Sequence, residues 1–118
     1  MPYMLLIIEP TGQRQARTEA EGHEVYERML RFAGDLKERG LLLGAESLGP
    51  LANAARVQVH GGKPRVLDGP FSEAKEMIGG FFLIDCATRE EAVAIASKCP
   101  AAEWCTVEVR NLAPCYES

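Results

Sequence analysis

The chain of 118 residues is the size of one domain, and its 47% hydrophobic content is enough to build one core. A net charge of −4 and a pI near 5.2 argue against nucleic acid as a partner, because such a partner requires a basic face. The longest apolar runs, MLLII and FFLI, are far shorter than the ~20 residues that cross a bilayer. The N-terminus has no basic region of a signal peptide, so we expect a cytoplasmic protein that does not bind membranes.

The first half of the chain is predicted to form a strand, a helix and a second strand. Residues 3–8 are a continuous apolar run, which is typical of a buried strand. Residues 13–21 are polar and without a period, so we expect a loop there. From 22 to 39 apolar residues recur at spacings of three and four, which predicts an amphipathic helix with Gly40 as its C-terminal cap. Residues 41–48 predict the second strand.

The second half is predicted to contain a hairpin, a central strand, a helix and a last strand. Residues 56–67 alternate on either side of a Gly-Gly turn, which favours a β-hairpin. Residues 80–86 form the most apolar strand of the chain. Thr88 opens a Thr-x-x-Glu capping box, so a helix is expected over 88–98, followed by a strand over 106–110. The buried face of that helix is expected to contain Ala92, Ile95 and Ala96.

This order of elements predicts one domain over residues 1–118 with a ferredoxin-like α+β sandwich. Two strand–helix–strand units are present, with a hairpin inserted between them and an antiparallel sheet. The first strand of each unit lies in the centre of such a sheet. The two most apolar strands, 3–8 and 80–86, are those two strands, so the hydrophobic pattern agrees with the topology.

The first strand also predicts a homodimer. Successive side chains of a strand point to opposite faces, so Leu5 and Ile7 oppose Met4, Leu6 and Ile8. Two helices cover only one face of a four-stranded sheet. The other face would expose more apolar surface than a monomer normally leaves bare. A second copy packed sheet to sheet would cover it.

The segment DGPFSEAKEMIGGFFLID, which begins at Asp68, joins the hairpin to the central strand. Together with MLLIIE, GAESLGP, ATREEAVAIASKCP and TVEVR, it resembles the YCII-related superfamily, specifically its DGPF branch, over nearly the whole chain. The resemblance implies a ferredoxin-like fold that dimerises as an α+β barrel, and it implies no reaction. Some members are encoded beside, or fused to, sigma factors of the extracytoplasmic-function type, so it also implies such a factor as a partner.

The narrower YCII-type branch is associated with a His–Asp pair, which this chain lacks at the matching positions. Counting back from Gly40 places Met29 where the His would stand, and Cys99 precedes Pro100 where the Asp would stand. His23 lies nearer the start of the helix and does not match. No catalytic residue is assigned, and whether the protein is an enzyme stays open.

The DGPF segment contains two predicted structural features. Asp68, Gly69 and Pro70 are expected to shape a turn, with Asp68 stabilising it by roughly 1 kcal/mol through local hydrogen bonds of its side chain. Gly79 and Gly80 indicate a close approach of the backbone or a positive φ, at a bulge or at a site.

Charged residues in and near this segment are candidates for the rim of a ligand cleft. Carboxylates beside a lysine can polarise or deprotonate a small substrate when burial shifts one pKa towards neutrality. The alternative is that these charges only solvate a surface bend. The candidate ligand-cleft residues are Glu46, Asp68, Glu73, Lys75 and Glu76.

No metal site and no cofactor are predicted. The cysteines at positions 86, 99, 105 and 115 show no CxxC spacing and no nearby His, and we expect all four to be reduced and structural. Two functions remain open. The dimer either binds or converts a small polar molecule in a cleft, or it acts as a noncatalytic regulatory partner associated with an extracytoplasmic-function sigma factor.

Overall fold

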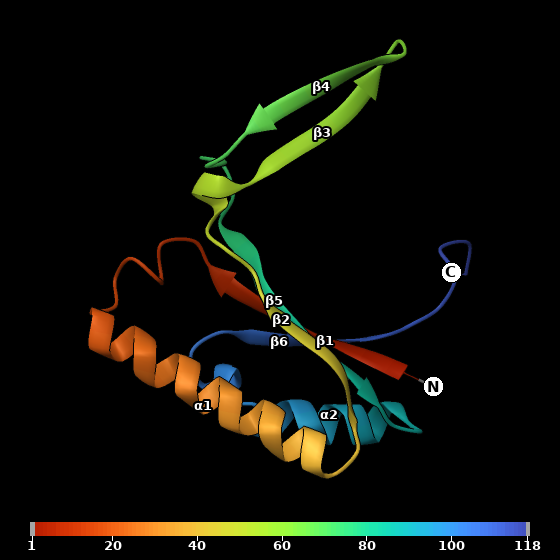
Figure 1. The fold of residues 1–118 in the computed structure, drawn as a ribbon. Coiled ribbons are helices and arrows are strands. Elements are labelled where there is room, and N and C mark those ends of the chain that lie inside the picture. Colours follow the sequence, from red (N-terminus) through yellow and green to blue (C-terminus); the bar gives the residue numbers. More distant parts are fainter. Residues whose placement is uncertain (1, 118) are drawn as a thin grey trace.

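A four-stranded antiparallel sheet with two helices on one face forms the body of the computed structural model, which describes residues 2–117 (Figure 1). The strand order is β2-β5-β1-β6. The strands of the body are β1 (Pro2–Pro10), β2 (Leu42–Ser47), β5 (Glu76–Asp85) and β6 (Thr106–Asn111). The remaining elements of the body are the helices α1 (Glu19–Glu38) and α2 (Arg89–Lys98) and the 3₁₀ turns η1 (Leu51–Asn53) and η2 (Pro100–Glu103).

The topology confirms the predicted ferredoxin-like α+β fold. The two central strands are β1 and β5, as the hydrophobic pattern indicates, and each is hydrogen-bonded on both sides. The helix-facing side of the sheet is the core. Leu5 and Ile84 are fully buried there, and Leu36 of α1 packs on them. The rings of Phe32 and Phe82 meet edge to face with centroids 5.2 Å apart.

Helix α1 begins at Glu19, three residues earlier than the apolar spacing predicts. A capping box holds its first turn: Thr18 Oγ1 accepts from Glu21 N at 3.1 Å, and the Glu21 carboxylate accepts from Thr18 N at 2.9 Å. These hydrogen bonds hold the pKa of Glu21 below its ordinary value. The expected loop over 13–21 is therefore too long, because local capping rather than apolar periodicity sets this end of the helix.

Strand β5 likewise begins earlier than predicted, at Glu76 rather than at residue 80. Ile7 pairs with Gly80, whereas Ile8 pairs with Ile78, so the register shifts between them and Gly79 lies at a bulge. The second half of the DGPF segment is thus part of the central sheet. At the other end of the chain the helix prediction holds: Thr88 is the N-cap of α2, and the buried residues of α2 are Ala92, Ile95 and Ala96.

The sheet face away from the helices, called the open face below, has an apolar centre. Its side chains come from the two central strands and are half-buried, apart from Ile78, which is 47% exposed. Charged residues Glu108 and Arg110 of β6 form an ion pair of 3.6 Å at its edge. The apolar residues of the open face are Met4, Leu6, Ile8, Ile78, Phe81 and Leu83.

The predicted hairpin is present as a separate two-stranded sheet of β3 (Ala55–His60) and β4 (Lys63–Asp68), called the arm below. Gly61 and Gly62 have φ of 57° and 78° and form its tip, a conformation that glycine adopts without strain. Figure 1 shows the arm projecting from the body on the side opposite the two helices. All of its strand residues are exposed. Over residues 2–117 no helix is both long and apolar enough for a transmembrane span.

Candidate functional site

A cavity of about 570 Å³ lies between α1 and the helix-facing side of the sheet. This volume is within the range of small-molecule sites, roughly 300–1,000 Å³. Most of its wall is apolar, with a charged end where the loop after β1 meets β2 and β5. The apolar and aromatic lining includes Ile7, Val25, Tyr26, Met29, Leu30, Ala33, Ala45, Phe82 and Trp104.

Helix α1 forms one wall of the cavity with its N-terminal half. Val25, Met29 and Ala33 follow each other at a spacing of four, so they lie in one row on the helix. The C-terminal half of α1 packs directly on the sheet through Leu36, which is fully buried. In the N-terminal half, Tyr26 is 53% exposed although it also borders the cavity. The cavity therefore opens towards solvent at the start of α1.

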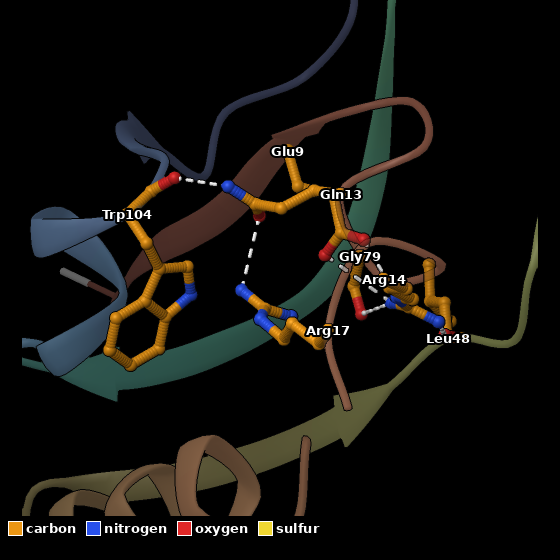
Figure 2. Close-up of polar contacts among 7 residues, drawn as sticks. All are labelled: Glu9, Gln13, Arg14, Arg17, Leu48, Gly79 and Trp104. Atoms are coloured by element: carbon orange, nitrogen blue, oxygen red, sulfur yellow. Dashed lines mark hydrogen bonds and ion pairs between the residues drawn. The ribbon is translucent and has the colours of Figure 1, made fainter. Parts of the chain in front are cut away.

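An ion pair between a buried carboxylate and a partly exposed guanidinium forms the charged end of the cavity (Figure 2). Glu9, the last inward-facing residue of β1, is only 7% exposed. Arg14 Nε donates to Glu9 Oε1 at 2.6 Å, and Arg14 Nη2 lies 3.4 Å from Glu9 Oε2. The same guanidinium donates to Leu48 O at 2.8 Å and to Gly79 O at 3.2 Å. Arg14 thus connects the loop after β1 to the C-terminal end of β2 and to the bulge of β5.

Glycines make this arrangement possible. A Cβ on Gly79 would lie 2.8 Å from Glu9 Cδ and 3.0 Å from Arg14 Nη2, so a side chain would displace the ion pair. A Cβ on Gly80 would lie 2.7 Å from Glu46 O of the neighbouring strand. The two glycines at the bulge therefore let β5 approach both this ion pair and β2.

The second charged group of the cavity is Arg17, beside Trp104. Arg17 Nη2 donates to Gln13 Oε1 at 3.3 Å, and its guanidinium carbon lies 5.8 Å from the Trp104 ring centroid. Gln13 Nε2 in turn donates to Trp104 O at 2.6 Å. Figure 2 shows this chain of contacts joining the loop after β1 to the region after η2. The loop is thereby held over the mouth of the cavity.

The charge of Arg17 is less compensated than that of its neighbours. Arg14 is paired with Glu9, and Arg28, whose guanidinium lies 5.3 Å from the Trp104 ring centroid, is paired with Glu103. The Arg28 hydrogen bond lowers the pKa of the Glu103 carboxyl. Over residues 2–117, no carboxylate lies within ion-pair distance of Arg17, although its charge acts on Glu21 at longer range and, after the Thr18 hydrogen bonds, helps to lower the pKa of that carboxyl. Arg17 is therefore a cation available to an anionic ligand in the cavity.

His23 also borders the cavity, near its mouth. Its side chain is 77% exposed, and its Nε2 lies 3.9 Å from Glu19 Oε1 on the same helix. This imidazole therefore lies on the solvent-facing surface of the helix.

Four of the five candidate cleft residues lie away from this cavity. Asp68, Glu73, Lys75 and Glu76 are exposed and do not line it. Glu46 contributes to the lining, but Ala45 next to it pairs with Phe82 on the helix-facing side. Because strand side chains alternate, the Glu46 carboxylate points to the open face.

The turn at the start of the DGPF segment is held by its backbone rather than by Asp68. Gly69 N donates to Ala54 O at 2.7 Å, and a Cβ on Gly69 would lie 2.9 Å from the carbonyl carbon of Leu51. The Asp68 carboxylate has no hydrogen-bond partner in the described part of the chain, residues 2–117. Phe71, after the turn, is buried, and the Arg56 guanidinium lies 3.8 Å from its ring centroid.

One thiol of the body, that of Cys105, is affected by the charged end of the cavity. Cys105 is half-buried, and burial together with the negative charge of Glu9 raises the pKa of its thiol to about 11. Cys99 and Cys105 are free thiols inside the protein, and Cys115 is a free thiol on the surface. No group of three or more His, Cys, Asp or Glu residues suited to a metal occurs among residues 2–117.

The sequence contains one signal for the charged end of the cavity. Leu5, Ile7 and Glu9 alternate on the inward face of β1, which places a carboxylate at a buried position. A buried carboxylate requires a cation or donors close by. No local pattern identifies Arg14 as that cation, nor brings Trp104 next to Arg17.

Comparisons with known proteins cover nearly the whole chain. A family model described as "YCII-related domain" matches residues 1–115. An uncharacterised protein of Rhizobium meliloti (strain 1021) is 38% identical over 115 residues, which is 96% of this chain and 93% of the relative. The match spans the sheet, both helices and the arm, so it covers the cavity as well as the core. The chain therefore belongs to the YCII-related family.

Proposed function

We propose that the protein binds a small molecule with an apolar or aromatic body and an anionic group in the cavity between α1 and the sheet. The observation that carries this proposal is the position of Arg17. It is a cation without an ion-pair partner in the described chain, beside an aromatic ring and at the charged end of an apolar cavity. A carboxylate or phosphate would supply the missing charge, and a guanidinium binds either group through two parallel hydrogen bonds.

The shape of the lining supports a ligand of this kind. Trp104, Phe82 and Met29 give the ligand body an apolar and polarisable wall. Arg14 already has four hydrogen-bond contacts to protein groups, so it serves as a fixed part of the wall rather than as the binding group. The proposal specifies binding; whether the ligand is also converted is decided by measuring turnover in the same experiment.

We also propose that the protein forms a homodimer. The same proposal places it in the DGPF branch of the family and in the cytoplasm. The open face has an apolar centre of six side chains and a charged edge, which is the composition of a protein interface. Covered by a second copy, it would lie on the side of the sheet away from the cavity. Each copy would then keep its own cavity, with a shared sheet interface behind it.

Fluorescence provides a direct test, because Trp104 is the chain's one tryptophan and it borders the cavity. A panel of aromatic and alkyl carboxylates is titrated against the protein, alongside the matched neutral amides, and Trp104 emission and melting temperature are recorded. We expect at least one carboxylate to bind about tenfold more tightly than its amide, a difference of about 1.4 kcal/mol. Disappearance of the ligand is followed in parallel to detect turnover.

Two variants locate the site. Arg17→Met keeps an unbranched stem but removes the guanidinium and its charge, so the preference for carboxylate over amide should disappear. Arg31→Met, on α1 and outside the cavity lining, makes the same change of residue type and is the matched control, so it should bind as the wild type does. Equal carboxylate affinity in wild type and Arg17→Met, or no response to any carboxylate, would rule out the proposed site.

A further inference from the structure

The arm is amphipathic, and in the described part of the chain, residues 2–117, all of its strand residues are exposed. On one face Val57 pairs with Val66 and Val59 with Pro64. Val57 is 62% exposed, Val59 is 67% exposed and Val66 is 63% exposed. The other face is polar and basic apart from Leu67, and consists of Arg56, Gln58, His60, Lys63, Arg65 and Leu67.

Such a hairpin needs a packing partner. Two isolated strands are marginally stable in water at best, because they bury too little apolar surface to offset their loss of chain entropy. At the base of the arm, Gly69 N donates to Ala54 O and joins the two ends of the hairpin, and the Arg56 guanidinium lies over the Phe71 ring. Beyond this base, the valine face is exposed to solvent in the single chain.

We propose that the arm packs its valine face on a second copy of this chain and clasps the partner in the dimer. Figure 1 shows the arm standing on the side of the sheet that is opposite the helices, which is the side of the open face. A second copy placed on the open face would therefore lie beside the arm. The inference rests on the proposed homodimer and adds a second contact to it.

The size of the open face supports a second copy of the chain as the partner of the arm. Four strands spaced by ~4.8 Å and six residues long at ~3.4 Å each give a projected area on the order of 400 Å². A stable interface usually buries about 800 Å² on each partner, so the open face supplies about half of that. One face of a two-stranded arm of the same length is on the order of 200 Å². In the dimer each copy would bury its open face, one face of its own arm and the surface under the partner's arm. These three areas bring the buried surface of each copy to about 800 Å².

The distribution of charge also favours a second copy. The arm holds three of the 13 Lys and Arg residues, Arg56, Lys63 and Arg65, but only one of the 17 Asp and Glu residues, Asp68. The rest of the chain is therefore more acidic than the net charge of −4 indicates. A basic arm lying along the acidic body of its partner brings opposite charges together, which favours this pairing over a wrong one.

The oligomeric state of arm variants tests the inference. The valine-face variant Val57→Thr/Val59→Thr/Val66→Thr keeps β-branched side chains of the same shape, so the hairpin itself should persist. We expect its dimer dissociation constant, measured by sedimentation equilibrium, to rise at least about tenfold, because buried methyl groups are replaced by hydroxyls. The matched control, Gln58→Thr/His60→Thr/Arg65→Lys, changes as many residues on the other face while keeping the charge of position 65, and its dissociation constant should stay within about threefold of wild type.

Hydrogen exchange provides a second measurement that does not depend on substitutions. Amides over residues 55–68 should exchange more slowly above the dissociation constant of the dimer than below it, because the clasped arm opens less often. Equal exchange at both concentrations would overturn the inference, as would equal dissociation constants for the valine-face variant and the wild type.

One further variant separates this inference from the homodimer itself. Leu6→Glu places a charge in the centre of the open face and should dissociate the dimer. If Leu6→Glu dissociates the dimer and the valine-face variant does not, the sheet interface is supported. The proposed contact of the arm with the second copy is then overturned, and the valine face would bind a different protein. A wild-type chain that is monomeric at every concentration would overturn both, while the ligand proposal is judged separately by Trp104 fluorescence.

Discussion

Gly79 leaves the space that the Glu9 carboxylate fills. The Cβ of any other residue at position 79 would lie 2.8 Å from Glu9 Cδ, closer than real side chains approach each other. The glycine sits at the bulge of β5, where its carbonyl also accepts from Arg14 at 3.2 Å and from Leu48 N at 2.9 Å. One glycine of the DGPF segment thus makes room for the ion pair at the end of the cavity.

Gly79→Ala should therefore destabilise the protein although the new methyl group is small. We expect the free energy of unfolding to fall by about 1–3 kcal/mol, as is usual when a packed site is overfilled. Urea denaturation measures the loss. Gly34→Ala is the control: a Cβ there meets nothing within 4 Å, and alanine in a helix is better than glycine by roughly 0.5–1 kcal/mol, so this variant should be more stable. Equal effects of the two changes would contradict the role of Gly79.

Arg14→Met should leave the Glu9 carboxylate buried without its cation. Removing one partner of a buried pair costs roughly 3–5 kcal/mol, and because the Arg14 side chain is 31% exposed we expect about 2 kcal/mol. Adding Glu9→Gln to this variant should recover part of the loss, since no charge is then stranded. The surface pair Arg39–Asp35, at 3.6 Å, is the comparison: Arg39→Met should change stability by less than about 0.5 kcal/mol.

The turn of the DGPF segment should depend on Gly69 rather than on Asp68. Gly69→Ala would push a methyl group into the Leu51 carbonyl, so it should lower the melting temperature by several degrees, or about 1–3 kcal/mol. Asp68→Ala removes no hydrogen bond seen within residues 2–117, and we expect a change within about 0.5 kcal/mol. A loss of stability in Gly69→Ala but not in Asp68→Ala would show that the Asp68 side chain does not cap the turn. A large loss in Asp68→Ala with none in Gly69→Ala would reverse the assignment.

The Cys105 thiol should weaken the fold at alkaline pH. Burial raises its pKa in the folded chain to about 11, above its ordinary value of about 9. The folded state therefore favours the protonated thiol, and this contribution is complete below pH 9 and is lost as the pH rises towards 11. Melting temperatures of wild type and Cys105→Ala are compared from pH 8 to 11. Cys105→Ala should lose less stability over that range than the wild type, and parallel curves would contradict the burial of this thiol.

Periodicity in the sequence is enough to predict the fold because its signals are local. Apolar runs mark β1 and β5 as the central strands, and spacings of three and four mark α1 and the buried face of α2. The Gly-Gly tip and the alternation on either side of it identify the arm. The errors lie at the ends of elements. Helix α1 starts early because Thr18 caps it, and β5 starts early because a bulge at Gly79 lets the strand continue.

The cavity, by contrast, is decided by tertiary packing. Its charged end joins Gln13 to Trp104, 91 residues apart, and Arg14 to Gly79, 65 residues apart. Side chains at such separations meet only when the sheet order and the path of the loop after β1 are both set, and no local pattern specifies either contact. The charges of the DGPF segment stand out in the sequence, yet the structure places them on the surface, whereas Arg17 stands out only once Trp104 lies beside it. A sequence states which residues are polar, but burial and the distance to a partner determine which of them can bind a ligand.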